Sequence, residues 1–175
     1  MSDDDVVFGA PAGQAKPTRL SALRKAIQAQ ERLNSRIVRI AKPETCVWEL
    51  DLRIPTDGYE LEEVSKQAAE RLKKSGGQVS NMRLQLHVCA GLLARYTVAI
   101  WDSGQDDPIV DARADRDAAF ADEGVLAELG VKDSIAAVFA LFQADPTIIA
   151  FGEEFIDEYA GDAEAFTIED PTAGD

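Results

Sequence analysis

Apolar residues recur every three or four positions from Asp122 to Gly161, the most strongly patterned part of the chain. This spacing places side chains on one face of a helix. Asp133 and Asp145 each precede such a stripe, where a carboxylate can accept hydrogen bonds from the free N–H groups of a helix start, and Pro146 fits a first turn. We therefore expect two or three short helices sharing one aromatic face, with Gly161 as the final stop. The apolar positions of the last two helices are Ile135, Val138, Phe139, Phe142, Ile148, Phe151, Phe155 and Tyr159.

Three further helices are predicted upstream, at residues 18–33, 59–75 and 80–98. The third is apolar around most of its circumference, which is typical of a central helix. Apolar residues also alternate from Met82 to Val88, and this leaves a strand as the competing interpretation of its first half. The first helix is predicted to place Leu20, Leu23 and Ile27 on one face.

Polar and apolar residues alternate from Cys46 to Ile54, which predicts a half-buried strand. The apolar segment at residues 36–40 would pair with it as a ribbon, and such a ribbon needs a helix to rest on. Loop-forming residues from Asp102 to Pro108 have apolar flanks, so they fit either a small hairpin or a simple loop. The predicted fold class is mainly α (α+β), a helical domain with one or two short N-terminal β-strands near residues 36–54.

The two ends of the chain differ from its middle in composition. Residues 1–17 and 162–175 are polar and contain Gly and Pro, and such segments bury too little apolar surface to offset the entropy of ordering. We expect a disordered N-terminal tail and a disordered acidic C-terminal tail. Residues 18–161 are expected to form a single domain, since the chain has 175 residues, 46% of them apolar.

The formal charge of −14 is unevenly distributed. Residues 17–43 carry seven basic side chains and one acidic one, whereas residues 116–175 carry two basic and fifteen acidic ones. So negative a field repels phosphate backbones, and we expect no nucleic-acid partner. No apolar run approaches the roughly 20 residues that span a bilayer, and the N-terminus is acidic where a signal peptide is basic. We therefore expect no membrane partner and a cytoplasmic location.

Residue types that carry catalysis or bind metals do not occur in a working pattern. Cys46 and Cys89 lie far apart in the sequence, which fits small core residues better than a metal site or a disulfide. His87 is the sole histidine, and without a nearby nucleophile and acid it is interpreted as a structural or surface residue. The acids that begin at Asp102 do not match the ligand spacing of a calcium loop. We expect no enzymatic activity, no catalytic residue, no metal site and no cofactor.

The order of the elements resembles that of a known family. A strand ending in Leu52-Arg53-Ile54-Pro55, a turn, a helix rich in Glu and Lys, and Ala140-Leu141-Phe142 before a capped terminal helix are similar to the tail assembly chaperones of long-tailed (siphovirus-type) actinobacterial phages, the class of the lambda-like G protein. The resemblance covers roughly residues 36–161. It implies a protein that binds the phage tape-measure protein and helps to recruit the tail tube protein in the host cytoplasm, and that is absent from the finished virion. Self-association is a further expectation, and the basic helix at residues 17–33 departs from the family pattern.

The aromatic residues of the predicted terminal helix are the candidate partner-binding site. Phe151, Phe155 and Tyr159 are spaced as the anchors of helix-in-groove recognition are, and Trp101 is a further candidate. The alternative is that all these rings belong to the core. Two other functions stay open: a structural phage protein of the head–tail junction or a scaffold, and an inhibitor of a host protein.

Overall fold

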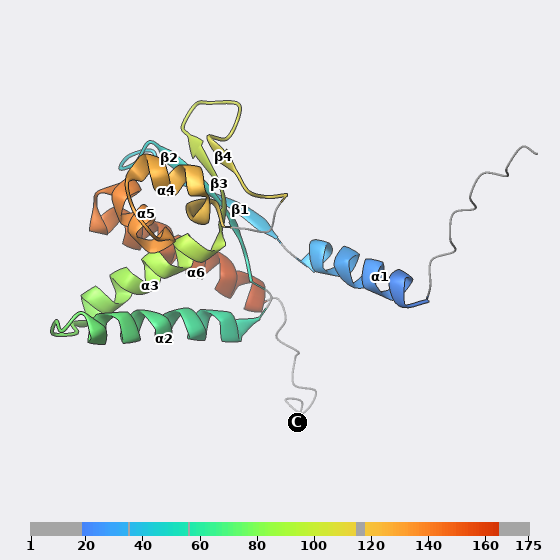
Figure 1. The fold of residues 1–175 in the computed structure, drawn as a ribbon, viewed down its shortest axis with the longest axis horizontal. Coiled ribbons are helices and arrows are strands. Elements are labelled where there is room, and N and C mark those ends of the chain that lie inside the picture. The colour runs from blue at the N-terminus through green and yellow to red at the C-terminus, as the bar shows by residue number, and fades with distance from the viewer. Residues whose placement is uncertain (1–18, 35, 56, 115–117, 165–175) are drawn as a thin grey trace, which may run out of the picture. The chain divides into compact units, whose positions relative to one another are not determined.

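The computed structural model describes residues 19–34, 36–55, 57–114 and 118–164 (Figure 1). The tail expected at residues 1–17 lies outside this range, as do residues 165–175 of the expected C-terminal tail. The chain divides into two compact units, residues 1–34 and 35–175. The described residues are mainly helical with one small antiparallel sheet, which confirms the predicted fold class.

The first unit contributes one helix, α1, which spans Arg19–Asn34. Its start and end agree with the predicted helix to within one residue. Leu20, Leu23 and Ile27 lie on one face of α1 by their spacing, and all three side chains are exposed. α1 is therefore an amphipathic helix whose apolar stripe is not covered by its own unit.

The second unit contains a four-stranded antiparallel sheet in the order β1-β2-β3-β4. The predicted ribbon near residues 36–54 is present as β1 (Ile37–Ala41) and β2 (Trp48–Arg53). Two strands are additional, β3 (Thr97–Asp102) and β4 (Val110–Asp111), so the hairpin interpretation of the segment between them is confirmed. The third predicted helix was expected to continue to Val98. It ends at Tyr96 instead, because Thr97 adopts extended backbone angles and β3 pairs with β2.

Six helical segments complete this unit. Side chains of Asp57, Ser80, Asp122 and Asp133 cap the starts of α2, α3, α4 and α5, each by accepting a hydrogen bond from a backbone N–H of the first turn. The segments are α2 (Gly58–Lys74), α3 (Asn81–Tyr96), the 3₁₀ helix η1 (Ala119–Ala121), α4 (Glu123–Leu129), α5 (Ser134–Phe142) and α6 (Asp145–Glu164).

Two local predictions about these helices were wrong, and one alternative is excluded. The strand alternative for Met82–Val88 does not hold, since this segment is helical within α3. Asp145 is the first residue of α6 rather than its cap, and the carbonyl of Ala144 accepts the N–H of Ile148 at 3.3 Å. α6 also runs through Gly161 to Glu164, because an exposed glycine with open space around it can remain helical.

α3 is the central helix, as its apolar circumference predicted. It packs against α2, α5 and α6 and reaches both β2 and β3 (Figure 1). Small residues permit these close crossings: a Cβ on Gly91 would lie 3.0 Å from Val64 Cγ1 of α2, and one on Gly152 of α6 would lie 2.4 Å from Cys89 Cβ. The core between α3 and one face of the sheet contains Ile40, Leu50, Leu52, Leu92, Leu93 and Ile100.

Candidate functional site

Two of the four predicted partner-binding rings lie in the core. Phe151 and Phe155 are 0% exposed. Phe155 stacks on Tyr96 with ring centroids 5.4 Å apart, and Phe151 contacts Phe142 at 5.1 Å. The close crossing of α3 and α6 turns this face of α6 inward. The expectation that Phe151 and Phe155 face a partner is therefore corrected, and the alternative that they are core residues describes them.

Tyr159 is half-buried near the start of α2. A Cβ built on Gly58 would lie 3.0 Å from the Tyr159 hydroxyl oxygen, so α6 approaches α2 closely at this point. One side of the ring packs against the core, and the rest is accessible. A partner contact at Tyr159 stays a prediction.

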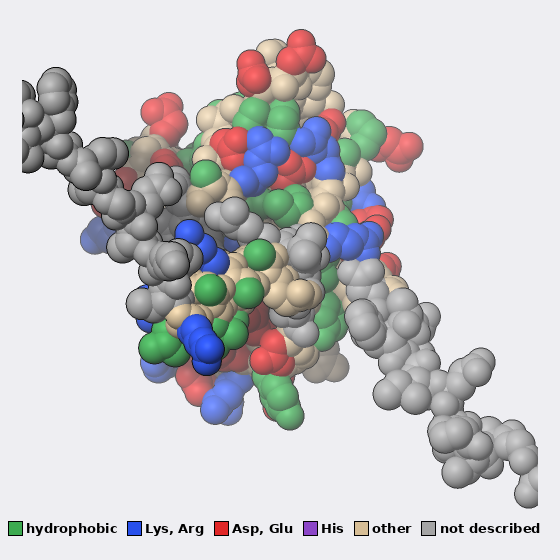
Figure 2. All heavy atoms as spheres, turned by 90° about the vertical axis from the view of Figure 1, so that its right-hand side faces the viewer, with side chains coloured by type: hydrophobic (Ala, Val, Ile, Leu, Met, Phe, Trp, Pro, Cys, Tyr) green, Lys and Arg blue, Asp and Glu red, His purple; other side chains and the backbone are tan. Residues whose placement is uncertain are grey.

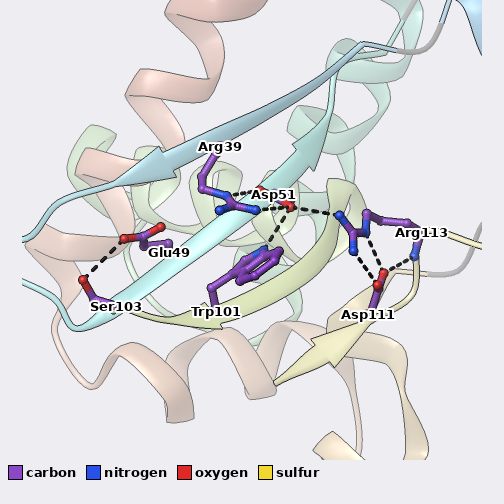
Figure 3. Close-up of polar contacts among 7 residues, drawn as sticks. All are labelled: Arg39, Glu49, Asp51, Trp101, Ser103, Asp111 and Arg113. Carbon is purple, nitrogen blue, oxygen red and sulfur yellow. Dashed lines mark hydrogen bonds and ion pairs between the residues drawn. The ribbon is translucent and has the colours of Figure 1, made fainter. Parts of the chain in front are cut away.

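Trp101 belongs to a polar cluster on the sheet face opposite the core (Figure 3). The Asp51 carboxylate, only 4% exposed, accepts hydrogen bonds from Arg39 Nε at 2.7 Å, Arg39 Nη2 at 3.0 Å and Trp101 Nε1 at 2.9 Å. The Arg39 guanidinium also covers the Trp101 ring, 3.8 Å from its centroid. Trp101 is 8% exposed, so it serves this cluster and offers little free surface to a partner.

Arg113 extends the same cluster toward β4. It donates from Nε and Nη2 to the two carboxylate oxygens of Asp111, and its Nη1 lies 3.8 Å from Asp51 Oδ2. These hydrogen bonds hold the pKa of the Asp111 carboxyl down at about 2. The Asp111 carboxylate is thus ionised and occupied at neutral pH. The cluster fits a structural role in tying β1, β2, β3 and β4 together, and it offers no free acid or base.

The face seen in Figure 2 intersperses acidic, basic and apolar side chains. Elsewhere, ion pairs fasten α6 across β1, with Arg36 Nη2 2.6 Å from Glu158 Oε2 and Lys42 Nζ 2.6 Å from Glu154 Oε2. Glu154 and Glu158 are one helical turn apart, and their partners stand at the two ends of β1. These charges therefore attach the terminal helix to the edge of the sheet.

Neither cysteine is an activated nucleophile. Burial raises the pKa of Cys89 to about 11, with a further contribution from Glu153, and burial also raises the pKa of Cys46. Both thiols are therefore protonated at neutral pH. Among the described residues, no group of His, Cys, Asp and Glu is arranged to hold a metal ion.

A groove that sequence reasoning missed lies between α2, α3 and α5. It has a volume of about 650 Å³ and is lined by Gln67, Glu70, Arg71, Lys74, His87, Asp133, Ser134, Ile135, Ala136 and Phe139. The His87 ring contacts Phe139, with centroids 5.5 Å apart. The sequence signals were present as the single histidine and the capped start of α5, but their meeting depends on how three helices pack.

Comparisons with known proteins found no relative. No family model matches the chain, and neither a curated protein nor a solved structure is similar to it at a significant level. Within the described ranges, no single helix is long and apolar enough to cross a membrane. α5 and α6 pass that test together as a pair bent by 116°, and both contribute buried residues to the core.

Proposed function

We propose that the chain is a tail assembly chaperone of a long-tailed actinobacterial phage. In this role it binds the tape-measure protein, helps to recruit tail tube subunits in the host cytoplasm and leaves before the virion is complete. Two things support the proposal: the order of elements that resembles this family, and the exposed apolar stripe of α1. The order of elements is the observation that carries the family assignment. The stripe lies on the helix that departs from the family pattern, and it adds an apolar surface on which a partner could dock.

The stripe has the character of a docking surface. Leu20, Leu23 and Ile27 are 75%, 57% and 50% exposed. α1 has 16 residues, only slightly more than the roughly 12–15 below which an isolated helix is marginal in water. Helices gain most of their stability by packing an apolar face, so α1 would be stabilised by packing its stripe on a partner. Arg24 is four positions after Leu20 and three before Ile27, so it borders the same face. α1 thus presents spaced apolar anchors with a basic border, as helices that dock on partner proteins do.

The second unit suits a carrier that stays soluble while bound to an apolar partner. Its large aromatic residues Phe120, Phe151 and Phe155 are fully buried, so its core is complete without the partner. The formal charge of −14 for the whole chain opposes aggregation. We therefore assign binding of the partner to α1 instead of to the aromatic face of the terminal helix.

Co-purification with the tape-measure protein tests this proposal. The full chain is co-expressed with fragments of the tape-measure protein from the same genome, and the fragment is captured. Leu23→Asp places a charge in the stripe and is expected to lower recovery of the chain about tenfold, the effect of losing one anchor residue. Ala29→Asp adds the same charge to the other side of α1 and is expected to leave recovery unchanged.

The comparison of the two variants decides the outcome. If Leu23→Asp and Ala29→Asp reduce recovery equally, helix disruption explains the loss and the stripe is not the contact. If neither variant reduces recovery, or the wild-type chain is not captured, α1 does not bind the tape-measure protein.

A further inference from the structure

The groove between α2, α3 and α5 has two cations on its wall that no carboxylate neutralises. Arg71 and the exposed Lys74 are one turn apart on α2 and line the groove, and neither side chain forms a hydrogen bond or an ion pair within the described ranges. Arg71 Nη1 is buried without a hydrogen-bond partner. In a chain with 18 basic and 32 acidic side chains, adjacent unpaired cations facing one groove are notable, because partner carboxylates are abundant.

The acids in the groove do not fill this role. Asp133 accepts hydrogen bonds from the backbone N–H groups of Ile135 and Ala136 through Oδ1, which caps α5, and its carboxylate forms no ion pair with Arg71 or Lys74 among the described residues. Glu70 is exposed and lines the groove without reaching either cation within ion-pair distance. The groove therefore keeps the capacity to bind one further carboxylate.

The rest of the wall is uncharged and includes an apolar part beside the polar Gln67 and Ser134. Ile135, Ala136 and Phe139 of α5 are partly buried, and the His87 ring lies against Phe139. Burial lowers the pKa of His87, and the positive charges of Arg71 and Arg83 lower it further, whereas Asp145 raises it. His87 is thus neutral at pH 7. An apolar side chain has a surface to pack against directly beside the two cations.

We propose that this groove binds a peptide segment of a partner protein in which a carboxylate side chain stands next to an apolar one. The carboxylate pairs with Arg71 and Lys74, and the apolar side chain packs on Phe139 and Ile135. Charge complementarity favours this occupant, because a chain of net charge −14 repels the many charges of a nucleic acid or an anionic membrane more strongly than it repels a single carboxylate. The inference does not depend on the tape-measure assignment.

His87 makes the test specific, because it is the only histidine of the chain. Its imidazole NMR signals are followed in the full-length protein during titration with the acetylated, amidated tetrapeptide Ala-Phe-Glu-Ala. Saturable shifts are expected. The bound carboxylate is also expected to raise the pKa of His87 relative to the free protein, because a nearby negative charge favours the imidazolium.

Matched variants locate the binding site. Lys74→Gln is expected to weaken peptide affinity roughly tenfold, as expected for losing a charge-assisted contact. Lys73→Gln removes the same charge from the neighbouring exposed position, which does not line the groove, and is expected to leave the affinity within about twofold, as for an exposed charge.

Four results would overturn the proposal. They are the absence of saturable His87 shifts, equal binding of the Ala-Phe-Gln-Ala peptide, equal weakening by both lysine variants, and binding of inorganic phosphate as tight as that of the peptide. The last would show a general anion site instead of a peptide groove.

Discussion

At the residue scale, Asp51 shows what strand alternation does and does not reveal. Alternation predicted a half-buried strand with Asp51 on the polar side, and the register places it there, opposite Arg39 and Ala99. The burial of this carboxylate could not be predicted, because Arg39 comes from β1 and Trp101 from β3. A buried charge persists where its oxygens are satisfied, and here three donors satisfy them.

The Asp51→Asn variant tests how much this cluster contributes to the stability of the fold. It removes the charge that Arg39 and Arg113 face and is expected to lower the free energy of unfolding by about 1–3 kcal/mol, since Arg39 is partly solvated. Asp111→Asn, at an exposed position of the same cluster, is expected to cost less than about 1 kcal/mol. Urea unfolding measures both. Equal costs would mean that burial of Asp51 adds nothing to stability.

At the element scale, the helices were predictable where local signals agreed. The apolar periods placed α2 and α3 closely, and the apolar period together with the cap at Asp133 placed α5. The start of β3 was misplaced because Thr97 and Val98 continue the apolar run of α3, and the pairing with β2 that makes them part of a strand is non-local. The aromatic site was misplaced for a related reason: periodicity shows that Phe151 and Phe155 share a face, but only tertiary packing decides what covers it.

The crossing of α3 and α6 yields a prediction with an internal control. In Gly152→Ala the added Cβ would lie 2.4 Å from Cys89 Cβ and 2.5 Å from Cys89 Sγ. The variant is expected to destabilise the fold by about 1–3 kcal/mol through overpacking. Gly161→Ala lies in the same helix with open space around it and is expected to be neutral or to stabilise by up to about 1 kcal/mol. If thermal unfolding shows the two variants to be alike, α6 does not pack this closely on α3.

At the scale of the whole molecule, the distribution of charge and of exposed apolar surface indicates more about function than any single site does. The chain combines a basic amphipathic helix with a strongly acidic C-terminal region, and the described residues contain no cluster suited to metal binding. Most of the large apolar side chains described in the second unit are buried, whereas the stripe of α1 and the groove of α2, α3 and α5 offer apolar surface to a partner. A function could be expected from the sequence only through the family resemblance. The residues of a binding surface have no fixed spacing along the chain by which they could be recognised.

Quantitative mass spectrometry of infected cells and of purified virions tests the proposed role in tail assembly. We expect the chain to be abundant in cells during tail assembly, when it is bound to the tape-measure protein, and absent from virions that contain that protein in full amount. Stoichiometric copies of the chain in purified virions would contradict the account and identify it as a structural protein of the particle.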